Sequence, residues 1–198
     1  LCQSRKITQI TLDCAFLLDT IIPPCIWEKN LVGITITRKL LKDDPRILPK
    51  EKQKSLLKSP GSLLHGKMPK SLTQMSGLSR LIINDIESNW ISPKSGYFQY
   101  ATKRKHHITG TLPELPASMV FIKLDSLDLH GEIPASWRSL KDLNYVKLNN
   151  MNISGSLNGA VFRGMRSLQR VWLGGLNVVG SIPWKTGFVP LLEAGLLE

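Results

Sequence analysis

A four-residue phrase, Gly-x-(Met/Ile/Leu)-Pro, recurs along the chain and constrains the fold more than any other feature. Clear copies (GKMP, GTLP, GEIP and GSIP) begin at Gly66, Gly110, Gly131 and Gly180, and a worn copy, GSLN, begins at Gly155. Repetition at a period of roughly 20 to 50 residues is typical of solenoids, in which similar units stack in a row. The chain is therefore expected to fold as a stack of coils.

Apolar residues repeat in step with this phrase. The unit at Leu140 aligns with the unit at Met165 at an offset of 25 residues. The residue that ends each phrase gives a series of phase marks along the chain: Pro23, Pro49, Pro69, Pro93, Pro113, Pro134, Asn158 and Pro183. These marks predict a single array of about eight coils over residues 1–198, with degenerate units over 24–60 and 86–107.

Each unit has the pattern of a short strand followed by a turn. Alternating apolar residues such as Leu143, Val146 and Leu148 predict a strand with one buried face. The Gly of the phrase is expected to turn the chain, because glycine adopts backbone angles that other residues avoid, and Pro ends hydrogen-bonded pairing. The return segment on the outer side is expected to be irregular or 3₁₀-like, with Trp27 and Trp137 covering the core.

These repeats resemble leucine-rich repeats of the subtype L-x-x-L-x-x-L-x-L-x-x-N-x-L-x-G-x-I-P. That subtype is best known from ectodomains of plant receptor-like proteins and receptor kinases. The repeats are also similar to those of kinetoplastid surface antigens, where a Trp often follows the Pro by three residues, as Trp137 follows Pro134. The resemblance implies an α/β-type solenoid, a leucine-rich-repeat horseshoe arc with a parallel concave sheet and an irregular or 3₁₀ convex side.

The chain departs from this consensus at the position three residues past the second strand Leu. In the family, an Asn at this position bonds to the backbone of the adjoining coil. Here the position holds Ala15, Ile86, Leu127, Met151 and Leu176. We therefore expect an apolar spine in place of a polar ladder, with the local backbone groups bonded to other partners.

The concave face supplies the candidate ligand-binding residues. Alternate residues of a strand point away from the core, which gives two exposed rows: Gln9, Gly33, Arg80, Phe121, Tyr145, Arg170, and Thr11, Thr35, Ile82, Lys123, Lys147, Trp172. The candidates are the aromatic and basic members of these rows: Arg80, Phe121, Lys123, Tyr145, Lys147, Arg170 and Trp172. Aromatic and Arg side chains often anchor partners. The alternative is that they stabilise the sheet through cross-strand packing alone.

The leading hypothesis is a non-catalytic module that binds a protein, peptide or glycan, as the recognition part of a cell-surface or secreted protein. An intracellular location is the alternative. One rival is a structural or antigenic coat protein without a specific ligand, and another is the sensing portion of a receptor-like kinase whose catalytic domain follows Glu198. We expect the chain to be part of a longer protein. The sequon Asn152-Ile153-Ser154 makes Asn152 a candidate for glycosylation.

Motifs of catalysis and metal binding are missing from the sequence, so no enzyme activity, cofactor or metal site is predicted. His65 and His130 precede the repeat Gly in two Leu-His-Gly copies, which repetition explains. The three cysteines are Cys2, Cys14 and Cys25, and a disulfide from Cys2 to Cys14 or Cys25 is left open.

The chain is basic, with a net charge of +11 from 26 Lys and Arg against 15 Asp and Glu. Much of this charge lies in 38–58 and 102–107, within or next to the degenerate units, where solvated loops explain it best. No recognition motif interleaves the basic residues, so no specific nucleic-acid partner is predicted. No apolar run reaches the roughly 18 to 20 residues that span a bilayer.

Overall fold

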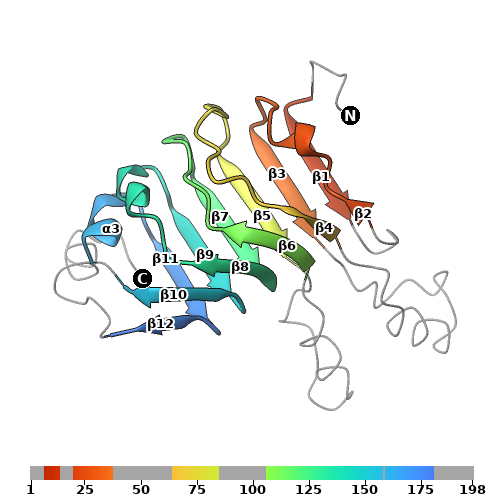
Figure 1. The fold of residues 1–198 in the computed structure, drawn as a ribbon. Helices are drawn as coiled ribbons and strands as arrows, with labels where there is room; N and C mark the ends of the chain where they lie inside the picture. The colour runs from red at the N-terminus through yellow and green to blue at the C-terminus, as the bar shows by residue number, and fades with distance from the viewer. Residues whose placement is uncertain (1–6, 14–19, 38–63, 85–105, 158, 181–198) are drawn as a thin grey trace, which may run out of the picture.

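The computed structural model describes residues 7–13, 20–37, 64–84, 106–157 and 159–180. Figure 1 shows these ranges as a curved stack of similar coils that follow one another in chain order, with the strands in two layers. Every pairing between named strands is parallel. The predicted leucine-rich-repeat solenoid with a parallel sheet is therefore confirmed.

The first layer, called sheet 1 below, is the predicted concave sheet. Its six strands lie in the order β1 (Gln9–Asp13), β3 (Gly33–Thr37), β5 (Arg80–Asn84), β7 (Phe121–Asp125), β9 (Tyr145–Asn149) and β11 (Arg170–Gly174). Each strand has five residues, and the first residue of each pairs with the first of its neighbour. Equivalent repeat positions therefore form straight rows across the sheet.

The second layer, sheet 2, was not predicted. Its strands lie in the order β2 (Thr20–Ile21), β4 (Leu64–Lys67), β6 (His106–Thr111), β8 (Leu127–Gly131), β10 (Asn152–Ser156) and β12 (Asn177–Val179). The phrase Gly was expected only to turn the chain, yet Gly66, Gly131 and Gly155 lie in these strands. His65 and His130 likewise lie in strands rather than in turns. Each repeat therefore contains two strands, because backbone pairing between coils resumes after the turn that follows the sheet 1 strand.

The outer segments confirm the 3₁₀ prediction in two coils and correct it in a third. Short 3₁₀ helices form at η1 (Pro24–Ile26) and η4 (Ala135–Ser139), whereas α3 (Gly159–Gly164) is α-helical. Trp137 covers the core as expected: it is 1% exposed, and its Nε1–H donates to the Pro113 carbonyl at 2.9 Å. Trp27 is partly buried against the same core.

The described residues contain six coils, each with one strand in sheet 1 and one in sheet 2. Strand β3 pairs directly with β5, and β5 pairs directly with β7. The ranges 38–63 and 85–105 each connect the two strands of one coil, β3 to β4 and β5 to β6. The phase marks at Pro49 and Pro93 fall within these ranges, so they add no strand between neighbouring coils. That the array covers residues 1–198 stays a prediction.

The core lies between the two sheets and follows the repeat. Strand positions such as Leu81, Ile122 and Leu148 are 0% exposed. The predicted apolar spine is confirmed at Leu127 and Met151, which are buried, while Leu176 is partly buried, and Ala15 and Ile86 lie outside the described residues. The backbone beside the spine bonds to the next coil: the Asn150 N–H donates to the Gly174 carbonyl at 2.9 Å.

Two further features concern the cysteines and the helices. Cys25 is disulfide-bonded, and Cys2 and Cys14 lie outside the described residues. None of the helices within the described ranges has the length and apolar character needed to cross a membrane.

Two copies of the phrase Gly give a matched test of backbone strain. Gly131 has a φ of +87°, whereas Gly66 lies outside the positive-φ region and an added Cβ would make only ordinary contacts with Ile22. We expect Gly131→Ala to lower the free energy of unfolding by about 1 to 2 kcal/mol. Gly66→Ala should change it by less than about 0.5 kcal/mol. Urea denaturation measures both, and equal losses would contradict the explanation.

The Trp137 hydrogen bond makes a second prediction. In Trp137→Phe, the buried Pro113 carbonyl loses its donor and a small void remains, so we expect a loss of about 2 to 4 kcal/mol in thermal or urea unfolding. The control is Trp172→Phe. Because Trp172 is 58% exposed, the same substitution leaves no buried void there. A control loss as large as that of Trp137→Phe would argue against the hydrogen bond as the cause.

Candidate functional site

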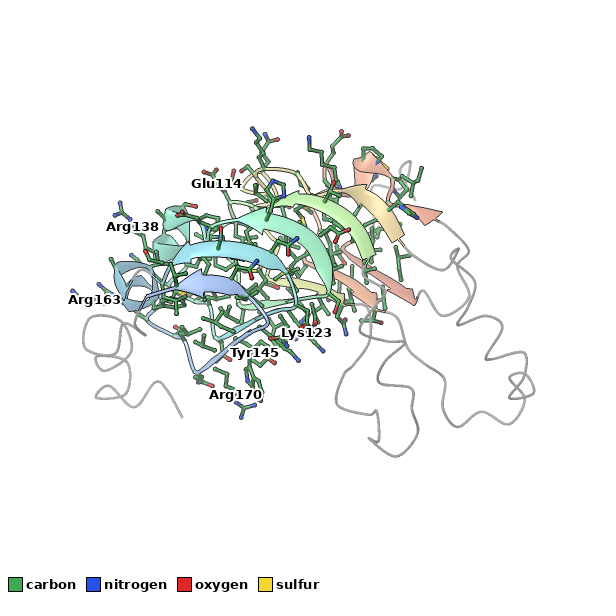
Figure 2. All side chains as sticks on the ribbon, turned by 60° about the horizontal axis from the view of Figure 1, so that its bottom comes forward. Glu114, Lys123, Arg138, Tyr145, Arg163 and Arg170 are labelled. Atoms are coloured by element: carbon green, nitrogen blue, oxygen red, sulfur yellow. The ribbon has the colours of Figure 1, made fainter. Side chains whose placement is uncertain are left out.

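The register of sheet 1 brings all seven predicted candidates onto neighbouring strands. Arg80, Phe121, Tyr145 and Arg170 are paired in sequence from β5 to β11, and we call them the Arg80–Arg170 row. Lys123, Lys147 and Trp172 are paired in the same way one row further along the strands. Figure 2 shows Lys123, Tyr145 and Arg170 projecting on one side, away from Glu114, Arg138 and Arg163.

The side chains of Arg80, Phe121 and Tyr145 stack on one another in the Arg80–Arg170 row. The Arg80 guanidinium carbon lies 5.5 Å from the centre of the Phe121 ring. The Phe121 and Tyr145 rings are 4.4 Å apart and only 3° from parallel. A cation over a ring face and an aromatic stack are both favourable contacts. These three side chains thus form contacts across the adjacent strands β5, β7 and β9.

Tyr145 is held as a neutral phenol. Burial raises the pKa of Tyr145 above its ordinary 10.0, and the positive charge of Arg170 offsets part of that rise. Burial disfavours the charged phenolate, while a nearby cation favours it. The hydroxyl therefore stays protonated at neutral pH and is able to donate a hydrogen bond.

The second row places a cation beneath an exposed indole. Lys147 is 8% exposed, and its Nζ lies 5.9 Å from the centre of the Trp172 ring and 3.8 Å from Asp125 Oδ2. Trp172 itself is 58% exposed. Of the seven candidates, Lys147 therefore has little surface left for a ligand. Its charge is paired within the protein, and its position supports Trp172.

A third row of side chains (Asn84, Asp125 and Asn149) lies where the chain turns from sheet 1 to sheet 2. It was not predicted from the sequence. Asp125 is 2% exposed and accepts hydrogen bonds from Asn150 Nδ2 at 3.0 Å, Ser126 Oγ at 3.1 Å and Asn149 Nδ2 at 3.4 Å. A buried carboxylate needs such partners because desolvation of its charge is costly. Asn84 is buried next to it in register. The missed signal was a polar residue directly after the second strand Leu or Ile, at Asn84, Asp125 and Asn149.

The chain turns at this corner through residues with positive φ. Ser126 and Asn150 have φ values of 58° and 52°, and Gly175 takes the equivalent place with 58°. Asn tolerates this conformation because its short polar side chain bonds locally. The Asn150 side chain bonds instead to Asp125 on the neighbouring coil.

The remaining candidate, Asn152, lies apart from these rows. It begins β10 on sheet 2, and its side chain is exposed, as is that of Ser154 in the same sequon. Within the ranges that the structure describes, no group of three or more His, Cys, Asp or Glu side chains could hold a metal ion.

Comparison with solved structures identifies the fold. The plant peptide hormone receptor RGFR1, solved in complex with RGF2, matches 95% of this chain with a TM-score of 0.52 and 19% identity. The leucine-rich-repeat ectodomain of the plant membrane receptor kinase GASSHO1/SCHENGEN3 from Arabidopsis thaliana, in complex with CASPARIAN STRIP INTEGRITY FACTOR 2, matches 100% of it with a TM-score of 0.47 and 20% identity. No protein-family model matches the chain, and no curated protein does.

The fold is therefore that of a leucine-rich-repeat solenoid of the kind found in plant receptor ectodomains, as the repeats predicted. The chain spans about a quarter of these structures: 26% of the length of RGFR1 and 24% of the other ectodomain.

The pKa of Tyr145 is open to direct measurement. In an alkaline titration followed by tyrosinate absorbance, subtraction of Tyr145→Phe isolates one of the three tyrosines, and it should titrate above 10.0. Arg170→Gln should raise this pKa further, because the lowering charge is gone. A raised folded-state pKa also means that its contribution to stability is present below pH 10.0 and is lost as pH rises through the folded value. A lower pKa in Arg170→Gln would contradict the assigned causes.

Proposed function

We propose that the chain is a non-catalytic recognition module that binds a protein, peptide or glycan ligand on the exposed face of sheet 1. The observation that carries this proposal is the contiguity of exposed anchors. Arg80, Arg170 and Trp172 are exposed on strands of one sheet, with the aromatic pair of Phe121 and Tyr145 between them. Residues of these types dominate binding energy at protein interfaces.

Exposure of Trp172 supports a binding role more than a purely structural one. A side chain that is 58% exposed gains little from burial within the fold. Covering the indole with a partner would remove that apolar surface from water. A ligand would therefore bury apolar surface of Trp172 that the sheet leaves exposed.

Several side chains of this surface are already fixed by contacts within the protein. The Asp125–Lys147 ion pair, at 3.8 Å and nearly buried, fixes the cation that lies against Trp172. The Phe121–Tyr145 stack restricts both rings. Side chains that are already ordered lose less conformational entropy on binding, which favours affinity.

A cell-surface or secreted location is the proposed setting. The disulfide at Cys25 is consistent with an oxidising compartment, where such bonds persist. The exposed sequon at Asn152 would accept a glycan in that compartment. RGFR1, which shares the fold, was solved with its bound partner RGF2. The receptor-kinase alternative remains part of this proposal, with any catalytic domain outside this chain.

One rival function has an observation in its favour. The ring faces of the Arg80–Arg170 row contact each other rather than open solvent, as expected if the row only stabilises a structural or antigenic coat protein. Binding measurements separate the two functions, because a coat protein would bind no ligand whose affinity depends on the side chains of sheet 1.

Selection from a displayed library of random dodecapeptides tests the proposed function. We expect the wild-type chain to retain peptides whose binding falls about tenfold or more in Trp172→Ala, a loss typical of an anchor residue. The matched control is Ile21→Ala, which removes an exposed apolar side chain (69% exposed) from sheet 2. Failure to retain any peptide, or equal losses in the two variants, would contradict a ligand-binding face on sheet 1.

A further inference from the structure

Two basic positions recur on the outer side of neighbouring coils, away from sheet 1. Arg138 and Lys141 become Arg163 and Arg166 at the offset of 25 residues that relates these two repeat units. Arg138 lies on η4 and Arg163 on α3, and the second basic residue of each pair follows its helix. All four side chains are exposed. The repeat therefore places basic residues at matching positions of two coils.

The two coils are closely packed here, so the matching positions are neighbours in space. Element η4 packs against α3. A Cβ added to Gly164 would overlap the carbonyl oxygen of Arg138, and the Ser167 N–H donates to the Lys141 carbonyl at 3.0 Å. Figure 2 shows Arg138 and Arg163 projecting on the side opposite to the labelled residues of sheet 1. The basic side chains therefore belong to one surface that spans two coils.

Three of these cations are unpaired among the residues that the structure describes. Arg138, Lys141 and Arg166 form no ion pair and no side-chain hydrogen bond within that part of the chain, and we call them the outer basic cluster. Arg163 has an interaction within the protein, so it is left out of the cluster. Asp142 is the one acidic residue within 135–142 and 159–167, and it is exposed. Three positive charges against one negative charge leave this surface positive.

The surroundings of the outer basic cluster favour recognition by charge rather than by apolar contact. Trp137 and Phe162, the aromatic residues of η4 and α3, are each 1% exposed, so neither offers a ring face on which a base could stack. Among the described residues, none of the large hydrophobic side chains that are exposed lies on η4 or α3, so no apolar anchor for a membrane is present on these helices. The cluster fits a polymer that supplies anionic groups and little apolar surface.

We infer that the outer basic cluster binds a linear anionic polysaccharide, which lies along η4 and α3 and crosses from one coil to the next. Each Arg guanidinium is able to hold a sulfate or carboxylate group through two parallel hydrogen bonds, and Lys141 adds a point charge between coils. The disulfide at Cys25 is consistent with an oxidising compartment, where such polymers are found. This site is separate from the exposed face of sheet 1 and does not depend on a ligand there.

The test measures binding of a short, labelled dextran sulfate to the full chain by fluorescence anisotropy, with uncharged dextran of the same length for comparison. Dextran sulfate should bind and uncharged dextran should not. The double variant Arg138→Gln/Arg166→Gln should weaken binding about fivefold or more, because two direct charge contacts are lost. Asp142→Asn should tighten it about twofold, because a repelling charge is removed.

A double variant with the same loss of charge is the matched control. Lys67 and Lys70 are exposed and unpaired among the described residues, and β6 and β8 separate the Lys67 strand, β4, from β10 in sheet 2. Lys67→Gln/Lys70→Gln should weaken binding by less than about twofold, which is the effect of overall charge alone. Equal weakening by the two double variants, equal binding of the two dextrans, or weaker binding in Asp142→Asn would overturn the inference.

Two other anionic partners serve as competitors. Stronger competition from single-stranded DNA of equal charge, or from vesicles of phosphatidylcholine and phosphatidylserine, than from unlabelled dextran sulfate would also overturn the inference. Trp172→Ala should leave the affinity for dextran sulfate unchanged, so loss of the sheet 1 ligand and loss of the polysaccharide site are separate results. Thermal unfolding of each variant checks that a loss of binding is not a loss of fold.

Discussion

The direct, in-register pairing of one coil with the next is the constraint on which the rest of this structure depends. A single coil cannot bury its own apolar face, so the coils are stable only as a stack. Strand β3 pairs with β5 residue for residue, although the range 38–63 separates β3 from β4 within its coil. Because the register is unbroken, side chains from residues 80 and 170 belong to one row.

A buried carboxylate, Asp125, links two neighbouring coils of this stack. Asp125 combines an ion pair with Lys147 and a hydrogen bond from Asn150, so its charge is satisfied where water is excluded. Both partners lie on the next coil. The interaction therefore joins two coils, holds the corner at Asn150, and positions Lys147 against Trp172 on the exposed face.

The exposed face differs from a simple aromatic platform. Stacking of Phe121 on Tyr145 uses ring faces that could otherwise contact a base. Burial of Tyr145 disfavours its phenolate and raises its pKa, and the charge of Arg170 offsets part of that rise.

The sequence by itself determined the solenoid and the buried strand positions, because these follow from local periodicity and from the apolar spine at Leu127 and Met151. It also predicted two exposed rows, in which Gly33 and Lys147 are in fact buried. It did not show that β3 pairs directly with β5, and β5 directly with β7. It also missed sheet 2 and the role of Asp125. Those features depend on pairing and charge satisfaction between residues far apart in the chain, and only the tertiary structure brings them together.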